Sequence, residues 1–354
     1  MCAALRAAWT RRTLHFSFTA RTSRETMTER STWYIKLWDS GTPGVCGIGE
    51  CAHFAGLSAE STEGFEAKLN DLCHSLNIGR RIDITRWSSL KMGLECALLD
   101  LENGGRRVLF PGPFTEGMSE VTINGLVWMG TPDEMLARID EKLAKGFRCL
   151  KMKIGGVKFA DELRLLDHIR MAFPPDKLTL RLDANGAFTP ENAMERLERL
   201  ANFDVHSIEQ PIRAGQLDKM SYLCENSPIP IALDEELIGI HDITQMRRLL
   251  YFVSPQYIVL KPTLCGGLSG ADAWITVARE KRIGWWVTSA LESNIGLNAL
   301  AQWTAALDTD MPQGLGTGAL YTDNIQSPLR LESDMLRIDP DAAWEIPPME
   351  WTEP

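Results

Sequence analysis

Three acidic residues recur along the chain at near-equal intervals, and each one ends a short apolar run. Asp183 closes LTLRLD, Glu209 closes VHSIE and Asp234 closes IPIALD, so the gaps are 26 residues (183 to 209) and 25 residues (209 to 234). One strand, one helix and their two loops use about this many residues, because a parallel crossover needs a dozen or more. The spacing therefore predicts that the three carboxylates lie at equivalent ends of successive parallel strands.

One lysine continues this spacing after the acids, and a pair of lysines precedes them. Lys261, in QYIVLKP, follows Asp234 by 27 residues, and Lys151 and Lys153, in FRCLKMKIG, precede the first acid. Residues two apart on a strand share a face, so Lys151 and Lys153 are expected to point the same way. Burial in a cleft beside other positive charges and a metal would lower both pKa values from about 10.4 toward neutrality, the range of a general base.

The ordinary explanations for these residues are solvated lysines and acids that cap helices. Either explanation would suit one residue alone, but not several elements in the same phase. Lys261 is followed by Pro262, which restricts the lysine to extended geometry and suits the tip of a strand. A shared site at one end of a parallel sheet is therefore the favoured interpretation.

The region that carries these residues alternates between apolar runs and amphipathic segments. Apolar runs start near residues 121, 148, 178, 205, 229, 256, 284 and 312. Two of the segments between them begin with Pro132 and Pro190, at the first helical position that proline favours. Alternating strands and helices predict a parallel sheet, and eight runs predict a closed barrel. Strand ends converge on one mouth of such a barrel, where three carboxylates would suit a hard divalent cation.

The chain divides into three parts by its pattern of apolar, polar and turn-forming residues. Residues 1–115 are expected to form an α+β domain, residues 116–320 the barrel, and residues 321–354 a polar tail that packs back on the first domain. Within the first part, RTLHFSFTAR and STWYIKLWD read as two strands joined by a turn near residues 25–29, and helices are expected at 59–75 and 86–103.

Composition limits the classes of function. The chain has 354 residues, 44% of them hydrophobic and 24% charged, which is typical of a globular protein. A net charge of −10 argues against nucleic acid as a partner, and no apolar run approaches the roughly 18 residues that span a bilayer.

The eight cysteines form no C-x-x-C pair and predict a reduced, cytoplasmic protein. The arginine-rich start resembles a transit peptide, but its strand-like alternation favours an untargeted chain. No oligomeric state is predicted.

Other residues are candidates for substrate contact. Arg181 lies two before Asp183 on the same predicted strand face, where it would bind an anion or support the carboxylate. The segment TSALESNIG offers Ser289 and Glu292 in a polar loop. Gly314 and Gly316 end the last apolar run, where a backbone without side chains approaches a ligand closely. A phosphate loop is disfavoured there, because no lysine follows at the required position.

The motifs K-x-K, D-A-N-G, E-Q-P, D-E and K-P, in this order and spacing, resemble the muconate-lactonizing subgroup of the enolase superfamily. The resemblance covers nearly the whole chain. It implies an α/β fold with a modified (β/α)7β TIM-like barrel and an N-terminal α+β capping domain. It also implies Mg²⁺, with Mn²⁺ as a substitute, and a lysine base that forms an enediolate. The implied metal ligands are Asp183, Glu209 and Asp234, and the implied acid–base residues are Lys153 and Lys261, with Lys151 assisting.

The resemblance also suggests substrate contacts outside the barrel strands. The segment GECAHFAGLS, from Gly49 to Ser58, is similar to the mobile specificity loop of this family. Its implied contacts are Phe54, Leu57 and Ser58. Asn185, in the D-A-N-G motif, is a further implied contact on the barrel side.

Three activities compete within the subgroup: o-succinylbenzoate synthesis, epimerisation of dipeptides (or racemisation of N-acyl amino acids) and muconate cycloisomerisation. Dipeptide epimerases usually carry Asp-x-Asp at the end of the eighth strand to hold the substrate ammonium. Here Gly314 and Gly316 stand at that place, and the pair Asp308 and Asp310 lies before the strand.

The segments RLDAN and SALESNIG resemble o-succinylbenzoate synthases most. The resemblance therefore implies a Mg²⁺-dependent carbon–oxygen lyase that acts on a small carboxylate in menaquinone biosynthesis, with no nucleic-acid or membrane partner. The alternative from another class is a non-catalytic barrel that binds an anionic metabolite, for which lysine bases would be unnecessary.

Overall fold

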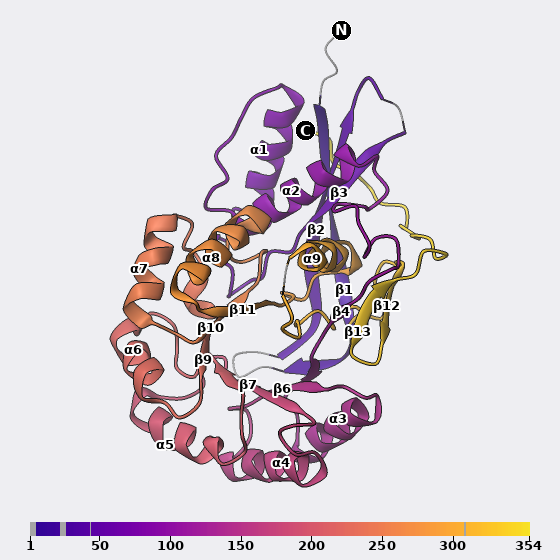
Figure 1. The fold of residues 1–354 in the computed structure, drawn as a ribbon. Coiled ribbons are helices and arrows are strands. Elements are labelled where there is room, and N and C mark those ends of the chain that lie inside the picture. The colour runs from indigo at the N-terminus through magenta and orange to yellow at the C-terminus, as the bar shows by residue number, and fades with distance from the viewer. Residues whose placement is uncertain (1–4, 22–25, 43, 308) are drawn as a thin grey trace.

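An antiparallel sheet and two helices form the first part of the chain in the computed structural model, which describes residues 5–21, 26–42, 44–307 and 309–354. The sheet has the order β1 (Leu5–Arg21), β2 (Thr26–Asp39) and β3 (Cys46–Cys51). Helices α1 (Phe65–Asn77) and α2 (Ser88–Glu102) cover one face of it (Figure 1). Apolar side chains of β2, α1 and α2 share one cluster, which gives this part its own core. Helix α2 lies within two residues of its prediction.

Helix α1 starts later than its sequence pattern suggested. A helix was expected from residue 59, but residues 59–64 form turns and bends, and α1 begins at Phe65. Thr62 in this stretch contacts the ring of His53, with 2.8 Å between Oγ1 and Nε2. Glu60 accepts from Ser89 N at 3.0 Å, at the start of α2, so contacts with His53 and Ser89 hold these two residues in place of helical hydrogen bonds. The predicted turn near residues 25–29 overlaps residues that lie outside the described ranges; β2 starts at Thr26.

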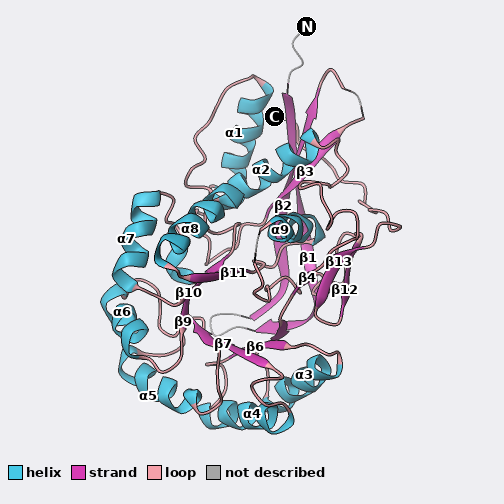
Figure 2. Cartoon of the chain, viewed as in Figure 1, coloured by secondary structure: helices cyan, strands magenta, loops and turns pink. Residues whose placement is uncertain are grey.

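Seven parallel strands form the curved wall of the second part. They are β5 (Gly125–Val127), β6 (Cys149–Lys153), β7 (Thr179–Asp183), β8 (Ser207–Glu209), β9 (Ile231–Leu233), β10 (Tyr257–Leu260) and β11 (Gly284–Val287). In the described residues, seven helices alternate with them and lie outside the wall (Figures 1 and 2): α3 (Pro132–Ala144), α4 (Phe159–Ala172), α5 (Pro190–Ala201), α6 (Leu217–Asn226), α7 (Ile243–Val253), α8 (Gly267–Lys281) and α9 (Asn294–Ala306). A short 3-10 helix, η1 (Glu235–Leu237), follows β9. The prolines expected at helix starts are the first residues of α3 and α5.

The eighth apolar run closes the barrel through a few backbone hydrogen bonds and not as a full strand. Gln313 N donates to Thr122 O at 2.8 Å, and Gln313 O accepts from Asn124 N at 2.8 Å. On the other side, Gly314 N donates to Val287 O at 2.7 Å. A proline before this segment and glycines within it limit its pairing, because proline lacks an N–H and glycine packs no side chain. The chain therefore has the predicted (β/α)7β order with a short closing element.

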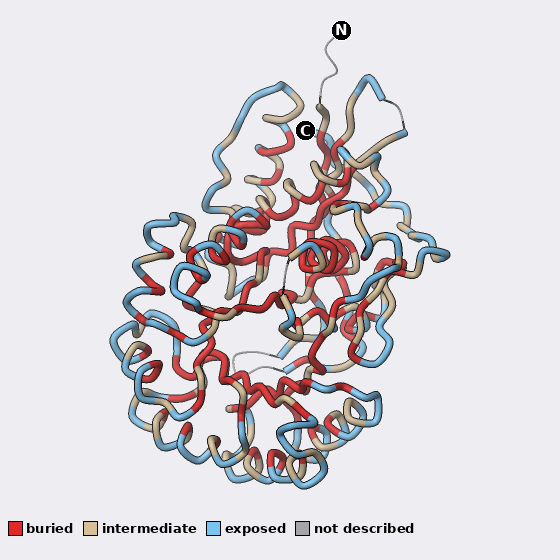
Figure 3. Tube along the Cα trace, in the orientation of Figure 1, coloured by how far each residue is buried: buried red, intermediate tan, exposed pale blue. Residues whose placement is uncertain are grey.

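The register of the barrel strands brings the predicted side chains to one level. Lys153 pairs with Asp183 across β6 and β7, and Asp183 pairs with Glu209 across β7 and β8. Side chains alternate along each strand, so the neighbouring apolar residues Met152 and Leu182 point outward and join the core beneath the helices. The strands appear as buried segments in Figure 3. Burial of both strand faces thus separates an apolar outer layer from a charged interior.

The last part of the chain forms a third sheet and pairs with the edge of the first one. Strands β12 (Leu329–Glu332) and β13 (Met335–Ile338) form a small antiparallel sheet with β4 (Val121–Thr122). Trp9 N donates to Thr352 O at 2.9 Å, and Thr352 N donates to Trp9 O at 2.8 Å, so the end of the chain lies beside β1. The division at residues 115 and 320 stays a prediction. No helix in the described ranges is long and apolar enough to cross a membrane.

We expect Gly49→Ala to destabilise the protein, because β3 and α2 approach closely at this residue. A Cβ at Gly49 would lie 1.9 Å from the backbone oxygen of Gly93, so one of the two elements must shift. Overpacking of this kind costs about 1–3 kcal/mol or more, which calorimetry or urea unfolding would detect. Gly112→Ala is the matched control, since its Cβ would meet no heavy atom within 4 Å. Equal unfolding free energies for the two variants would contradict this close packing.

Candidate active site

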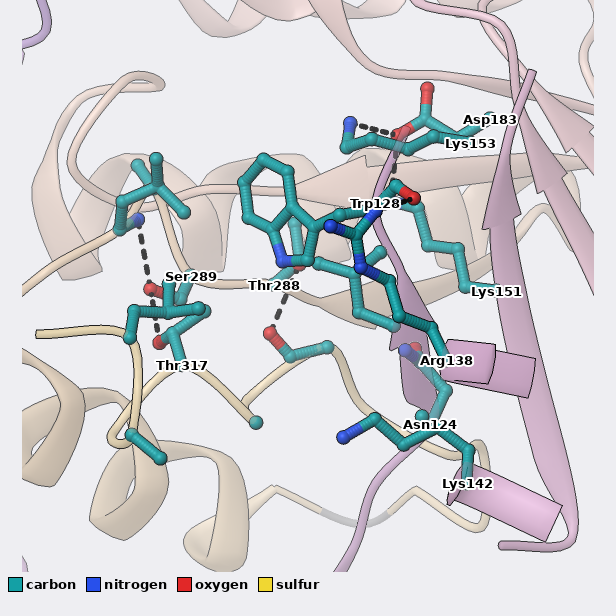
Figure 4. Close-up of a pocket in the computed structure, with 18 of the residues that line it drawn as sticks. Asn124, Trp128, Arg138, Lys142, Lys151, Lys153, Asp183, Thr288, Ser289 and Thr317 are labelled. Atoms are coloured by element: carbon teal, nitrogen blue, oxygen red, sulfur yellow. Dashed lines mark hydrogen bonds and ion pairs between the residues drawn. The ribbon is translucent and has the colours of Figure 1, made fainter. Parts of the chain in front are cut away.

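A cavity of ≈ 550 Å³ lies at the carboxyl ends of the barrel strands and receives the predicted lysines. Lys151 and Lys153 reach it from β6, and Lys261 reaches it from the residue after β10. Figure 4 shows Lys151 and Lys153 beside Asp183, with Trp128 close by. On the other side, the cavity is lined by residues of the first domain, the segment after β11 and the segment after the closing element: Ser17, Phe18, Met27, Phe54, Leu57, Ala290, Leu291, Thr317, Ala319 and Leu320.

The lysines and carboxylates form a buried array of ion pairs. Lys151 Nζ lies 2.5 Å from Glu209 Oε2 and 3.0 Å from Asp183 Oδ2. Lys153 Nζ lies 3.0 Å from the same Asp183 oxygen, and Lys261 Nζ pairs with Asp234 Oδ2. The exposed fractions of the three acids are 1%, 0% and 2% in chain order. The structure therefore brings together all six residues that the spacing singled out.

The two lysines of β6 differ in their surroundings and consequently in their pKa. Burial lowers the pKa of Lys153; the carboxylate of Asp183 raises it in part, while the charges of Lys151 and Lys261 act in the same direction as burial. Burial would also lower the pKa of Lys151, but Asp183 and Glu209 together raise it well above its usual range. The charges of the protein itself therefore lower the pKa of Lys153 and raise that of Lys151. The lowering of both pKa values by a metal stays a prediction.

The other members of the array also have shifted pKa values. Burial would raise the pKa of Asp183, but the adjacent lysines hold it well below its usual range. Burial raises the pKa of Glu209 to about 7, because Lys151 compensates only in part. Burial would lower the pKa of Lys261, but Asp234 and Glu235 raise it. Lys153 is therefore the member of the three lysines whose surroundings favour the neutral amine.

The carboxylates suit a hard divalent cation. Glu209 Oε1 is buried and has no hydrogen-bond partner, which is costly for a carboxylate oxygen. Oxygen ligands from several carboxylates are the set that Mg²⁺ accepts. In the described ranges, no three acidic, histidine or cysteine side chains already converge as a metal-binding group, and the Lys151 ammonium lies between two of these acids. The residues present fit the cation by their chemistry and by this unpartnered oxygen.

Two residues of the β11–α9 loop have roles that sequence reasoning did not separate. Glu292 is fully buried and does not line the cavity; it accepts hydrogen bonds from Thr263 Oγ1 at 2.6 Å and Ser289 Oγ at 2.5 Å. Ser289 does line the cavity, but its proton is committed to Glu292 while its oxygen accepts from Thr317 Oγ1 at 2.9 Å. Glu292 therefore orients the loop, and Ser289 offers a ligand no free donor.

Arg181 lies below the cavity and not in it. Its side chain is fully buried, its Nη1 donates to Pro312 O at 2.7 Å, and its guanidinium carbon lies 4.0 Å from the centre of the Trp286 ring. Sharing a face with Asp183 made it a substrate candidate, but two residues along a strand place it one layer deeper in the barrel. The predicted contact of Arg181 with substrate is therefore wrong for this structure.

The remaining candidates lie close to their predicted places. Asn185 lines the cavity, and its Oδ1 accepts from Lys153 Nζ at 2.7 Å. Phe54 and Leu57 line it from the capping side, but Ser58 does not: its Oγ accepts from Phe54 N at 3.0 Å and closes the loop on itself. Residues 49–51 of the predicted mobile loop belong to strand β3, so the loop begins at Ala52.

The part of the cavity wall that the closing element forms has glycines in place of larger side chains. Gly314 and Gly316 both line the cavity as predicted. A Cβ at Gly314 would lie 2.1 Å from Thr288 Oγ1. Asp310 does not line the cavity, and Asp308 lies outside the described residues. This wall therefore presents backbone where dipeptide epimerases were expected to carry carboxylates.

Sequence reasoning missed the contribution of the first barrel strand. Leu126 pairs with Lys151, so Leu126 and its period-two neighbours Asn124 and Trp128 face the interior. The Trp128 ring centre lies 5.7 Å from Lys153 Nζ. Alternation along this short strand was the signal that could have identified these three residues.

The fold and the site define a class: capped parallel barrels with acids and lysines at the mouth. Residues 134–342 match the family model described as "Enolase C-terminal domain-like". The chain belongs to this family, and thereby to the enolase superfamily.

Individual relatives narrow the comparison. The o-succinylbenzoate synthase of Desulfotalea psychrophila is 43% identical, over 94% of this chain and 98% of the relative. The crystal structure of MenC from the same organism has a TM-score of 0.84 at 41% identity, covering 95% of this chain and 100% of that chain. The L-Ala-D/L-Glu epimerase of Bacillus subtilis is 27% identical, over 74% of this chain and 70% of the relative. The similarity to the synthase is thus both higher and more complete.

Proposed function

We propose that the protein is a metal-dependent carbon–oxygen lyase that dehydrates succinyl-hydroxy-cyclohexadiene-carboxylate to o-succinylbenzoate, a step of menaquinone biosynthesis. The observation that carries the proposal is the positive charge of the cavity. Several lysines line it, and the wall formed by Gly314 and Gly316 offers a ligand no free carboxylate. Such a cavity suits a substrate with two carboxylates and no ammonium. The full-length similarity to an o-succinylbenzoate synthase supports the same choice.

Lys153 is the proposed base. Its lowered pKa favours the neutral amine, and its amine lies in the cavity between Asn185 and Trp128. It removes the proton next to the ring carboxylate, and the C–H electron pair is delocalised onto that carboxylate to give an enediolate. The ring then expels hydroxide from the adjacent carbon, and the Lys153 ammonium returns its proton to the leaving oxygen. The products are water and an aromatic ring, so the proton abstraction is the demanding step.

Lys261 and Lys151 have different proposed roles. Lys261 follows β10, four strands from β6 in the sheet order, so it faces Lys153 from the other side of the barrel. Its raised pKa keeps it an ammonium, which stabilises negative charge on the substrate. Lys151 bridges two carboxylates and holds them in place. Mg²⁺, or Mn²⁺ in its stead, would be held by Asp183, Glu209 and Asp234 and would stabilise charge on the substrate carboxylate as a Lewis acid.

The nearest alternative is racemisation of an amino acid derivative, since two opposed lysines also suit proton exchange on both faces. A dipeptide ammonium needs a buried anionic partner, because an unpaired buried charge is expensive. The acids that line the cavity are Asp183, already shared by two lysines, and Glu141, which pairs with Lys145 at 2.6 Å. N-acyl amino acids have a neutral nitrogen and need no such partner, so weak racemisation of them is compatible with the cavity. Muconate-type cycloisomerisation has no specific observation in its favour.

Removal of a proposed metal ligand tests the cation. We expect Asp234→Asn to lower Mg²⁺ affinity by at least about 100-fold, beyond the 10–100-fold typical of residues behind the ligands, and to abolish turnover with little change in circular dichroism. Titration calorimetry with Mg²⁺ measures this directly. Asp242→Asn, at the exposed start of α7, is the control and should bind Mg²⁺ as the wild type does. Full activity of Asp234→Asn, or of the wild type in excess EDTA, would exclude the metal role.

The difference between the two lysines of β6 gives a second test. Lys153→Ala should lose at least about 10⁴-fold in kcat, as expected when an essential acid–base group is removed. Lys151→Ala should lose less, because this lysine supports carboxylates and moves no proton. Lys158→Ala, an exposed lysine beyond the same strand, should leave kcat unchanged. A Lys153→Ala enzyme within about tenfold of the wild type would assign the base to another residue.

The third test separates the lyase from its relatives. An absorbance assay for the aromatic product with the cyclohexadiene acid should show efficient turnover, and mass spectrometry should show negligible deuterium exchange into dipeptides. Slow deuterium exchange into N-acyl amino acids would not contradict the proposal, because Lys153 and Lys261 on opposite sides of the barrel can both exchange protons with a substrate. Dipeptide exchange at a rate near that of dehydration would replace the proposed function with epimerisation, and no dehydration at all would reject the lyase.

A further inference from the structure

Arg30 joins the capping domain to the barrel through one buried guanidinium. It lies on β2, and the residue is only 8% exposed. Its Nη2 donates to Ala52 O at 2.6 Å and to His53 O at 3.3 Å, in the loop after β3. Its Nη1 donates to Leu291 O at 2.9 Å and also to Ala290 O, in the loop after β11. A planar group with several fixed donors can hold four carbonyls from two loops, which a lysine cannot do.

The barrel loop that Arg30 holds contains a strained residue. Leu291 has a φ of 66°, in the left-handed region that a bulky side chain rarely adopts. Its carbonyl accepts from Arg30 and from Tyr321 Oη at 2.7 Å, and its N–H donates to Ser289 Oγ at 3.0 Å. Strained backbone persists where surrounding contacts determine it, often at functional sites. Leu291 lines the substrate cavity, so these contacts fix part of the cavity wall.

Arg30 also holds the aromatic residue of the capping loop. Its guanidinium carbon lies 4.9 Å from the centre of the Phe54 ring. Phe54 lines the substrate cavity on one side and, on the other, a second cavity of ≈ 400 Å³ that Arg30 and Trp33 also line. The second cavity leaves the ring room to move away from the substrate. Arg30 is therefore placed to keep Phe54 in the wall of the first cavity.

We propose that Arg30 is a positioning residue that shapes the substrate cavity by holding Phe54 and the strained Leu291 together across the two domains. It contacts the loop backbone and the Phe54 ring, while the acid–base lysines have their own separate partners. The expected effect of its loss is weaker binding of the non-reacting part of the substrate, with proton abstraction preserved. The choice of substrate rests on the proposed function, but the positioning role itself does not.

Three variants and one control separate positioning from mere stabilisation of the interface. Arg30→Met keeps the apolar stem and removes every donor, and Arg30→Lys keeps the charge without the planar fork. Tyr321→Phe removes only the hydroxyl that contacts Leu291 O and keeps the ring, whose centre lies 4.8 Å from that of Phe16. Arg11→Met is the control: Arg11 lines the second cavity and donates to Ser31 and Glu66, but it contacts neither loop that Arg30 holds.

Two measurements are made on the full-length variants. In steady-state kinetics, Arg30→Met should raise KM about tenfold with kcat within about threefold of the wild type, the pattern of lost uniform binding. Tyr321→Phe should change KM in the same direction by less, and Arg11→Met should not change it. In hydrogen exchange read by mass spectrometry, Arg30→Met, Arg30→Lys and Tyr321→Phe should each speed exchange in residues 289–293, and the two Arg30 variants also in residues 52–58.

The exchange measurement needs no substrate, so it remains decisive if the wild type fails to dehydrate the cyclohexadiene acid. Unchanged exchange in 289–293 for the folded Arg30 variants would overturn the proposal, as would a fall in kcat with KM unchanged. If Arg30→Met does not fold, the test uses Arg30→Lys and Tyr321→Phe. The proposal is then overturned if both variants have the same exchange rates in residues 289–293 and the same KM as the wild type.

Discussion

The mouth of this barrel depends on the mutual neutralisation of three buried carboxylates by the buried Lys151 and Lys153 and the half-buried Lys261. Each ion alone would be expensive to bury, and the attraction between them compensates only when partners are held at short distance. Lys151 Nζ lies within 3.0 Å of two acids, and one of them, Asp183, is shared with Lys153. Strand register supplies this geometry, because β6, β7 and β8 end at the same level. The array would be lost with a slip of one residue, which would turn its side chains outward.

Lys151 and Lys153 have the same side chain but different pKa values, because they have different numbers of carboxylate partners in this array. Lys151 has two carboxylate partners and Lys153 has one carboxylate and one amide. Burial acts on both, so the partners decide which amine loses its proton more readily. A general base needs a pKa near the working pH. The barrel therefore separates support and acid–base roles by the number of acids within reach of each lysine.

The spacing of the acids predicted the site because in a barrel the repeat of one strand and one helix is also the repeat of position around the mouth. Glu209 and Asp234 could be identified from this spacing. The starts of α3 and α5 could be predicted from a separate signal, the proline at the first helical position. The spacing does not predict depth inside the barrel, so the substrate contact predicted for Arg181 is wrong. The sequence places Ser289 and Glu292 in one loop, and the fold then separates the residue that faces the cavity from the one that orients the loop.

The start of α1 and the closing element show a second limit of sequence reasoning. Apolar periodicity suggested a helix from residue 59, where contacts with the loop after β3 hold turns instead. The run near residue 312 looked like an eighth strand, but it pairs through isolated bridges. Both outcomes depend on contacts beyond the local pattern: Glu60 in the first case accepts from Ser89 N at 3.0 Å, and Gln313 and Gly314 in the second pair with residues far away in the sequence.

The closing element also constrains how the specificity of such a barrel can change. Its bridge to Thr288 brings Gly314 so close that a Cβ would lie 2.1 Å from the threonine hydroxyl. A carboxylate introduced at Gly314 to receive an ammonium would therefore displace the residue that joins this element to the end of β11. Gly316 is less crowded, since its nearest contact would be a side-chain carbon of Ile123 at 3.2 Å. A carboxylate that receives an ammonium thus requires the bridge to change if it is placed at Gly314, but only a small shift of the Ile123 side chain if it is placed at Gly316. Because Gly314 also closes the barrel, Gly316 is the position at which this wall can gain a charge with less rearrangement of the backbone.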